Sequence, residues 1–326
     1  MELRKVQMTR GGTFFVTLPK SWALENGVSQ GSVVSASVTH DGSLVIDPRY
    51  DVEPISRTVT IKPSLHLSRE IIGKYLLGYD VIRVEAKDRI AMEQRAIVKE
   101  AVSRLVGLEI IEEDYTKIVM QCLLEPSALP PEKILRREHL IASGMYRDAV
   151  TALIDGEAQL AESVVARDNE VDRLYFLLVR ILRTIIQNPS LSEKLGVYPI
   201  DCLDYRLTGS LVESVGDQSL QIAEHAVRLR GERLENEASR SLSNLHNIVH
   251  EAYKDAVTAF LSRNISIAES VRDKKNAVEE LCDKVESASN TLTIEVAQSL
   301  ISVVSLIARI YDHSVDISDL TTPRPI

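Results

Sequence analysis

The stretch YRDAVTA at residues 146–152 decides the fold, because it returns as YKDAVTA at residues 253–259. The same shift of 107 residues brings the segment AESV at 161–164 onto an identical segment at 268–271. Both stretches stand in regions where apolar residues recur with the spacing of amphipathic helices. A repeat of this length indicates that a helical unit has been duplicated within the chain.

A third match completes the repeat. The segment VGDQS at 215–219 resembles IYDHS at 310–314, after a loop whose length differs between the copies. Each copy therefore contains about three helices, and we place the copies at 138–230 and 238–320. Two such units can share one core, because each buries its apolar stripe against the other. The sequence thus predicts a C-terminal all-α bundle of two three-helix repeats.

Acidic residues spaced four apart stand out on two helices of the first copy. Asp168 and Asp172 form one pair, and Glu213 and Asp217 form the other. This spacing puts both carboxylates of a pair on one helix face, where like charges cost about 0.2–0.5 kcal/mol. A bound cation would reverse that cost, and all-oxygen sites suit Mg²⁺, Mn²⁺, Ca²⁺ or iron. These four residues are therefore a candidate site for a divalent or iron-type metal ion.

Two plainer interpretations of the same acids stay open. Acidic helix faces are usually just solvated. Asp168 could also be the N-cap of a helix, with Asp172 in a favourable first turn. The second copy keeps only two of the four acids, since the corresponding residues are Lys275, Glu279, Ala308 and Asp312. We therefore predict metal at one cluster per chain at most.

Residues 1–52 are expected to form a small β-rich domain. Runs of β-branched, aromatic and apolar residues at 13–18, 33–38 and 44–46 predict strands, with an Asp-Gly hairpin turn before the last of them. A short helix is expected at 20–27. Fifty residues of short strands bury little surface, so such a domain usually needs a partner chain.

Residues 53–128 alternate between strand-like and helix-like patterns, which predicts a small α/β domain. We find no glycine-rich phosphate loop and no catalytic motif in it. The proline-rich stretch at 125–131 marks a boundary to the helical bundle. The expected strands are 57–61, 79–84, 108–111 and 117–124, and the expected helices are 67–77 and 89–106.

Other residue types argue against several classes of protein. The net charge of −9 excludes a chain that is basic all over, although a local basic face is compatible with it. The three cysteines are isolated, which indicates neither zinc ligands nor a disulfide framework and fits a reducing compartment. His246 and His250 lack the HExxH order of metalloproteases, so we interpret them as surface or inter-helix residues. No apolar run approaches 18 residues, so we expect a cytoplasmic protein without membrane insertion.

The duplicated repeat, with DNEVD at 168–172 and ESVGDQ at 213–218, resembles the PhoU family of phosphate-uptake regulators over residues 138–320. In that family, paired acidic motifs bind metal ions on the bundle surface. The resemblance therefore assigns the metal site to the first copy. Lys275 and Ala308 depart from the family pattern in the second.

The N-terminus resembles the SpoVT/AbrB swapped-hairpin domain through LRKVQ at 3–7, the glycine pair at 11–12, FFVTLPKSW at 14–22 and DGSLVIDP at 41–48. This resemblance implies an intertwined homodimer that binds DNA through basic residues around the first strand and the short helix. The same fold also serves dimerisation alone, or a toxin-partner interface. The implied DNA-binding residues are Arg4, Lys5, Arg10 and Lys20.

Two functional hypotheses follow. In the first, the protein is a dimeric transcriptional regulator of phosphate uptake, as the combination of both domains resembles archaeal phosphate-type regulators. In the second, the bundle is an adaptor that docks on a phosphate-transporter ATPase or a signalling kinase, and the N-terminal domain only dimerises. No sequence motif indicates an enzyme. A metal-dependent hydrolase that uses the first-copy acids would have to lose its activity in an Asp217→Ala variant.

Overall fold

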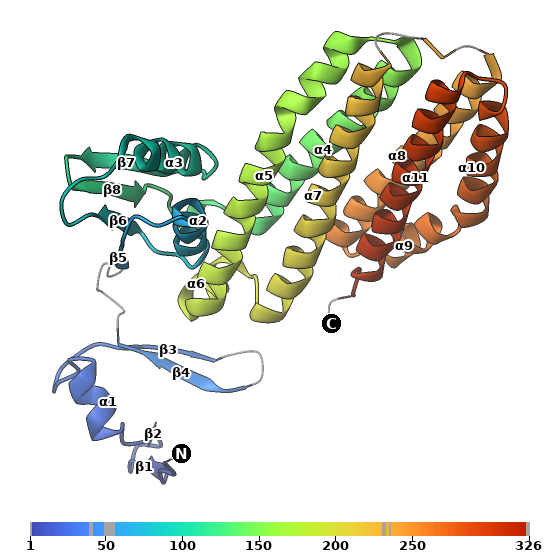
Figure 1. Cartoon of the computed structure of the whole chain (residues 1–326). Coiled ribbons are helices and arrows are strands. Elements are labelled where there is room, and N and C mark those ends of the chain that lie inside the picture. Colours follow the sequence, from blue (N-terminus) through green and yellow to red (C-terminus); the bar gives the residue numbers. More distant parts are fainter. Residues whose placement is uncertain (1, 39–41, 49–55, 230–232, 235, 324–326) are drawn as a thin grey trace. The chain divides into compact units, whose positions relative to one another are not determined.

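The structure is a computed structural model of the 326-residue chain (Figure 1). Its internal contacts divide the chain into two compact units, Met1–Ser56 and Arg57–Ile326. The boundary between them falls a few residues beyond the expected position 52. The described residues are 2–38, 42–48, 56–229, 233–234 and 236–323.

The N-terminal unit contains short strands and one short helix, as expected. Its elements are β1 (Gln7–Met8), β2 (Phe14–Phe15), α1 (Lys20–Glu25), β3 (Ser35–Val38) and β4 (Leu44–Asp47). The pairs β1–β2 and β3–β4 are antiparallel. The turn residue Asp41 lies outside the described residues. No side chain whose burial is described in this unit is buried. Many large apolar side chains are exposed, among them Leu3, Val6, Met8, Phe14, Leu24 and Val33.

The α/β domain at the start of the second unit has a four-stranded sheet in the order β5-β6-β8-β7. Strands β5 and β6 are parallel, and the other pairs are antiparallel. Strand β6 shows why this sequence forms a half-buried strand, since Ile82 and Val84 are buried while Arg83 and Glu85 are exposed. Its elements are β5 (Thr58–Ile61), α2 (Leu67–Leu76), β6 (Val81–Glu85), α3 (Met92–Ser103), β7 (Leu108–Glu113) and β8 (Lys117–Cys122).

The helical bundle follows a short 3₁₀ turn at Pro126–Ala128. The first repeat consists of α4 (Pro131–Asp155), α5 (Ala158–Gln187), α6 (Pro189–Leu195) and α7 (Pro199–Arg228). The second consists of α8 (Asn236–Ser262), α9 (Ile265–Arg272), α10 (Lys275–Ser289) and α11 (Ile294–Asp319). The long helix α5 of the first repeat therefore corresponds to two helices, α9 and α10, in the second. The helices of both repeats lie side by side and share one core (Figure 1).

The N-cap interpretation of Asp168 is wrong. Asp168 and Asp172 both lie in the interior of α5, which begins ten residues earlier at Ala158. At the equivalent position of the second repeat a helix does begin, because Lys275 is the first residue of α10. The helix continues through Asp168 because the apolar stripe that includes Val164 and Val171 packs into the bundle core.

Equivalent residues of the two repeats pack reciprocally across the α4–α8 interface. The ring of His139 contacts Tyr253, and the ring of His246 contacts Tyr146, each with 4.7 Å between centroids. His250 stacks on His246 at 5.3 Å. Burial lowers the pKa of His139 and His246 to about 4, so both rings are neutral at physiological pH. The histidines of the second repeat are therefore inter-helix residues.

One buried arginine joins the α/β domain to the bundle. The side chain of Arg180 on α5 is only 4% exposed. Its guanidinium donates hydrogen bonds to the carbonyl oxygens of Tyr75 (2.7 Å) and Tyr79 (2.9 Å), at the C-terminal end of α2. It also lies 3.3 Å from a carboxylate oxygen of Asp80. A cation beside the last carbonyls of a helix is favourable, because those carbonyls lack partners within the helix.

Helix α11 is long and apolar enough to cross a membrane by length and composition alone. Half of its most apolar window is buried inside the structure. Val303, Ile307 and Ile310 on this helix have no exposed surface and belong to the bundle core. The apolar character of α11 is therefore accounted for by packing between helices.

Candidate functional site

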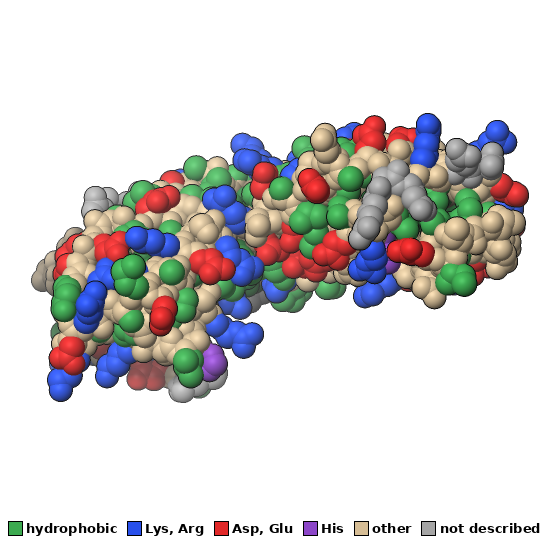
Figure 2. All heavy atoms as spheres, turned by 45° about the horizontal axis from the view of Figure 1, so that its top comes forward, with side chains coloured by type: hydrophobic (Ala, Val, Ile, Leu, Met, Phe, Trp, Pro, Cys, Tyr) green, Lys and Arg blue, Asp and Glu red, His purple; other side chains and the backbone are tan. Residues whose placement is uncertain are grey.

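The structure brings both acidic pairs of the first repeat onto neighbouring helices. Asp168 and Asp172 lie on α5, and Glu213 and Asp217 lie on α7, which packs along α5. Gly216 allows the close approach, since a Cβ atom there would lie 3.3 Å from a methyl group of Val171 on α5. We call these four acids the acidic cluster. Figure 2 shows Asp and Glu side chains gathered on the bundle beside the α/β domain, bordered by Lys and Arg.

The acidic cluster is electrostatically crowded. Partial burial, followed by the charges of Asp217, Asp172 and Asp168, raises the pKa of Glu213 to about 7. Partial burial and the other carboxylates likewise raise the pKa of Asp168 and Asp217. Carboxylates that oppose one another's ionisation are stabilised by any cation that binds among them.

The Asp217→Asn substitution is expected to lower the pKa of Glu213, because Asp217 supplies the largest charge effect on it. Since the pKa of Glu213 is raised on folding, its ionisation opposes folding. The stability of the bundle should therefore fall as the pH rises from 4.5 to 7. This dependence should weaken in the variant. NMR titration of the Glu213 carboxyl carbon measures the change in its pKa. Urea unfolding at several pH values measures the change in the pH dependence of stability. The exposed Glu170 on α5 provides the control Glu170→Gln, and an equal shift in both variants would contradict the assignment.

A guanidinium from the α/β domain already occupies part of the acidic cluster. Nη2 of Arg104, the residue that follows α3, donates to a carboxylate oxygen of Asp172 at 3.0 Å. Within the described part of the chain, no three Asp, Glu, His or Cys side chains are grouped so as to hold a metal ion. The all-oxygen donor set nevertheless fits a hard cation by its chemistry. Sequence reasoning missed Arg104, because it lies 68 residues from Asp172 and no local pattern marks the contact.

The second repeat is electrostatically different at the corresponding place. Lys275 replaces Asp168, and its ammonium lies 3.9 Å from a carboxylate oxygen of Glu279. Ala308 replaces Glu213 on α11. The second copy therefore carries a cation within its own helix, whereas the first receives Arg104 from another domain.

Sequence reasoning also missed Glu138 on α4. Its side chain has no exposed surface, and neither carboxylate oxygen has a hydrogen-bond partner. Burial, and then the charge of Glu213, raise the pKa of Glu138 well above 4.5. The equivalent residue of the second repeat is Leu245, which is also fully buried. Comparing the two repeats position by position would have revealed this acid in a leucine's place.

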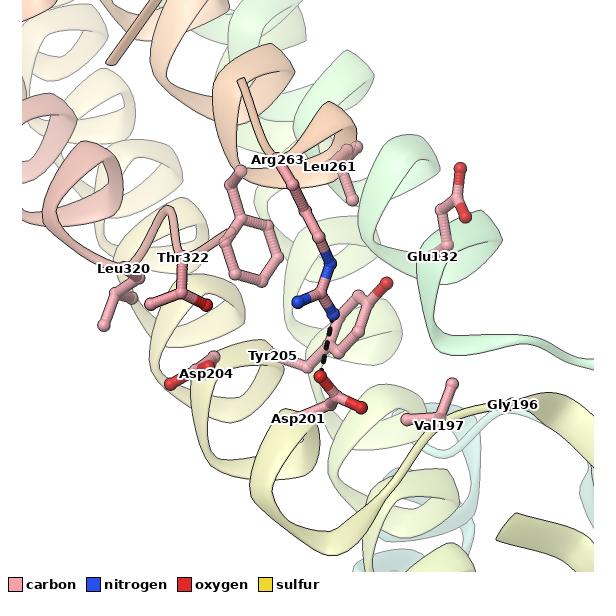
Figure 3. Close-up of a pocket in the computed structure, with 11 residues that line it drawn as sticks. Glu132, Gly196, Val197, Asp201, Asp204, Tyr205, Leu261, Arg263, Leu320 and Thr322 are labelled. Carbon is pink, nitrogen blue, oxygen red and sulfur yellow. Dashed lines mark hydrogen bonds and ion pairs between the residues drawn. The ribbon is translucent and has the colours of Figure 1, made fainter. Parts of the chain in front are cut away.

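A small hollow lies where the two repeats meet at one end of the bundle, and Figure 3 shows Arg263 pointing into it. Nη2 of Arg263 donates to the carboxylate of Asp201 at 2.7 Å, which links the end of α8 to the start of α7. Arg263 has a left-handed backbone with φ of 54°. The equivalent residue of the first repeat is Gly156, with φ of 72°. Glycine has no Cβ atom, so this conformation is not strained there. The ion pair accounts for a non-glycine residue at this position.

The strain at Arg263 predicts a difference between two substitutions. Both Arg263→Gly and Arg263→Ala remove the ion pair with Asp201, but only glycine relieves the left-handed backbone. The glycine variant should therefore be more stable than the alanine variant by about 1 kcal/mol in urea unfolding. Equal stabilities of the two variants would show that the backbone here is not strained.

The candidate DNA-binding residues lie on the surface of the N-terminal unit. Arg4, Lys5, Arg10 and Lys20 are all exposed. Arg4 forms an ion pair with Glu2. Lys20 is the first residue of α1. Exposed cations of this kind can neutralise phosphates of a nucleic acid.

Comparison with protein families matches both parts of the chain. The model described as the PhoU domain matches residues 135–226 and 242–321, more than half of the chain. The model described as antidote-toxin recognition MazE, a bacterial antitoxin, matches residues 7–55. Both family resemblances seen in the sequence are thereby confirmed.

Three curated relatives carry the name phosphate-specific transport system accessory protein PhoU homolog. The protein of Aquifex aeolicus is 25% identical over 56% of this chain and 81% of its own length. Homolog 1 of Methanothermobacter thermautotrophicus is 21% identical over 65% of this chain and 96% of its own. The protein of Pseudomonas putida is 28% identical over 56% of this chain and 75% of its own length.

Two solved structures share the fold of the bundle. PhoU from Pseudomonas aeruginosa has a TM-score of 0.53 at 20% identity and covers 60% of this chain and 95% of its own. The phosphate transport system regulatory protein PhoU from Streptococcus pneumoniae has a TM-score of 0.50 at 16% identity. The match covers 59% of this chain and 91% of the Streptococcus chain. With its duplicated helical unit and a PhoU model that matches both copies, the chain belongs to the PhoU family.

Proposed function

We propose that this protein is a cytoplasmic, DNA-binding regulator of phosphate uptake and not an enzyme. Its N-terminal unit would bind promoter DNA, and its PhoU bundle would receive the signal. The observation that carries this proposal is the joining of an antitoxin-type domain to a PhoU domain in one chain. The relatives named as phosphate-transport accessory proteins support the phosphate part of the proposal.

A homodimer through the N-terminal unit is part of this proposal. The described part of that unit exposes Phe14, Leu24 and Val33 by 69–71% each, and a second copy of the chain would cover such surface. Dimerisation would also double the basic residues that face DNA. When the logarithm of the DNA-binding constant is plotted against the logarithm of the salt concentration, each neutralised phosphate steepens the downward slope by about 0.9.

The test is DNA binding by a charge-reversed protein. The double variant Arg4→Glu, Lys5→Glu should lose binding to promoter fragments of phosphate-transport genes, and any residual binding should be less salt-dependent. Fluorescence anisotropy at several salt concentrations measures both effects. Lys133→Glu, an exposed charge reversal on α4, should leave binding unchanged. Genome-wide mapping of bound DNA in phosphate-rich and phosphate-starved cells extends the test, and an absence of enriched sites under both conditions would refute it.

The second candidate function is an adaptor. The bundle would dock on a phosphate-transporter ATPase or a signalling kinase, and the N-terminal unit would only dimerise. The extent of the PhoU match, more than half of the chain, favours this candidate. Charge reversal at Arg4 and Lys5 would then alter dimer stability at most.

The acidic cluster is proposed to bind a divalent or iron-type cation. Its four carboxylates would supply the ligands, and the crowding that raises the pKa of Glu213 would be relieved. A cation that favours one geometry of the bundle would change how the two DNA-binding units of a dimer are spaced. If Mn²⁺ leaves the affinity for promoter DNA unchanged, this coupling is wrong.

A further inference from the structure

Helix α7 exposes a row of large apolar side chains. Ile200, Leu203 and Leu207 are 68%, 61% and 49% exposed. Their spacing of three and four residues puts them next to one another on one side of the helix, where they form what we call the α7 ridge. Other sides of α7 pack against α4, α5 and α11 (Figure 1). Single exposed apolar side chains are ordinary, but a contiguous row of them marks an interaction surface.

The second repeat does not carry this ridge. The match of VGDQS with IYDHS extends back without a gap to the starts of α7 and α11, at Pro199 and Ile294. The residues of α11 that correspond to the α7 ridge are Glu295, Gln298 and Ser302, and all three are exposed. The same helix therefore packs into the bundle with polar residues at these positions. Packing within the chain does not account for the α7 ridge.

The side of α7 that carries the ridge ends in negative charge. Beyond Leu207 it continues through Ser210 and Ser214 to Asp217, an exposed residue of the acidic cluster. From Ile200 to Asp217 the spacing alternates between three and four residues, the spacing along which a second helix packs. This stretch is about 26 Å long, at 1.5 Å per residue. One of its ends offers apolar side chains, and the other offers carboxylates.

Negative charge is in surplus at the acidic cluster, although two arginines stand near it. Arg104 bonds Asp172. Partial burial and the other three carboxylates of the cluster outweigh the charge of Arg206 and raise the pKa of Glu213 to about 7. Surplus negative charge favours a partner that carries Lys or Arg, and it disfavours nucleic acid or an anionic lipid surface.

A second copy of α7 is a poor match for this surface. Parallel pairing of two such helices would set carboxylates against carboxylates. Antiparallel pairing over the full length would bury the carboxylates of each copy against the α7 ridge of the other. Both arrangements are unfavourable, because like charges repel and a buried carboxylate without a partner is costly. A helix with apolar side chains at one end and cations at the other complements both ends of the surface.

We infer that the side of α7 from Ile200 to Asp217 is a docking surface for an amphipathic helix of another protein, whose apolar side chains cover the α7 ridge and whose Lys or Arg side chains face the acidic cluster. This inference rests on the adaptor role, the second candidate function, and adds the surface and the chemistry of the partner. It is a case of recognition of a helix through regularly spaced apolar anchors. Because the second repeat lacks the ridge, each chain docks one such helix.

The probe is a synthetic peptide of about 18 residues, which spans about 26 Å as a helix. One side of this helix carries leucines in one half and lysines in the other, spaced alternately by three and four residues. The full-length protein should bind the labelled peptide, as measured by fluorescence anisotropy. A peptide of the same composition in scrambled order should bind about tenfold more weakly or worse. A peptide with glutamates in place of the lysines should show a similar loss.

The test variant, Leu203→Gln with Leu207→Ser, takes both new residues from the second repeat. Both sites are exposed, so urea unfolding should be unchanged. The affinity for the leucine–lysine peptide should fall by about tenfold or more, because a few apolar anchors carry most of such binding. The matched control is Ile294→Gln with Ile301→Gln, which replaces two exposed isoleucines of α11. It should keep the affinity of the unaltered protein.

Each contrary result has a distinct meaning. No binding of the peptide, or equal affinity in the test variant, overturns the docking surface. A lower molar mass of the test variant in light scattering also overturns it, because a second copy would then cover the α7 ridge. The adaptor role is tested separately, by binding of the ATPase subunit of a phosphate transporter to the unaltered protein. Binding of that subunit that survives in the test variant overturns the surface and leaves the adaptor role standing.

Discussion

Replacing Glu138 by leucine is expected to raise the free energy of unfolding by about 1–3 kcal/mol at neutral pH, the usual cost of a buried polar group without a partner. Both carboxylate oxygens of Glu138 lack a hydrogen bond, and the side chain has no exposed surface. The second repeat carries Leu245 at the equivalent position, fully buried in the same fold. Leucine therefore fits this kind of site and removes the desolvated acid.

The gain should depend on pH in a defined direction. In the folded chain the pKa of Glu138 lies well above 4.5, whereas in the unfolded chain it is ordinary. Above pH 4.5 the unfolded chain releases this proton and the folded chain retains it, so stability falls as the pH rises. The advantage of Glu138→Leu should accordingly be smallest at pH 4, where only the cost of the unpartnered neutral carboxyl remains, and grow towards pH 8. Urea unfolding at several pH values measures it.

Leu245→Glu is the mirror-image control, because it places the same acid in the second repeat and should destabilise the bundle. Glu138→Gln should remove the pH dependence but gain less stability, since a buried amide also needs partners. If Glu138→Leu instead destabilises the protein, Glu138 contributes a favourable interaction that the single chain does not contain.

Much of the fold could be predicted because its signals are local or repeated. The duplication at 146–152 and 253–259 gave the bundle, and the alternation of Val81–Glu85 gave a half-buried strand. The i,i+4 spacing of Glu213 and Asp217 placed both on one face of α7. These inferences rest on how often a side chain returns to the same face, which is about every 3.6 residues in a helix and every second residue in a strand.

Other features depend on where elements pack, which no local pattern specifies. The acids at Asp168 and Asp172 have the composition of a helix start, yet packing of the whole of α5 carries the helix through them. Arg104 meets Asp172, and Arg180 meets Tyr75, across 68 and 105 residues of chain. Such contacts follow only from the docking of one domain on another.

Arg180→Met is expected to weaken the joint between the α/β domain and α5 by about 2–4 kcal/mol, since hydrogen bonds to charged groups contribute about 1.5–3 kcal/mol each. Methionine can fill the same space, but the carbonyls of Tyr75 and Tyr79 would lose their donor. The loss should therefore appear first in the α/β domain and only later in the bundle.

Two native cysteines allow this local effect to be measured. Cys122 is buried on β8 of the α/β domain, and Cys202 is buried on α7 of the bundle. In Arg180→Met, alkylation of Cys122 should speed up by about tenfold or more, because the opening of its domain becomes less costly. The rate at Cys202 should stay unchanged. The exposed Arg183 on the same helix supplies the control Arg183→Met.

The pattern of the two rates decides what Arg180 does. Faster alkylation at Cys122 alone means that Arg180 holds the α/β domain against a bundle that is stable without it. Equal acceleration at both cysteines would mean that the two parts unfold as one cooperative unit.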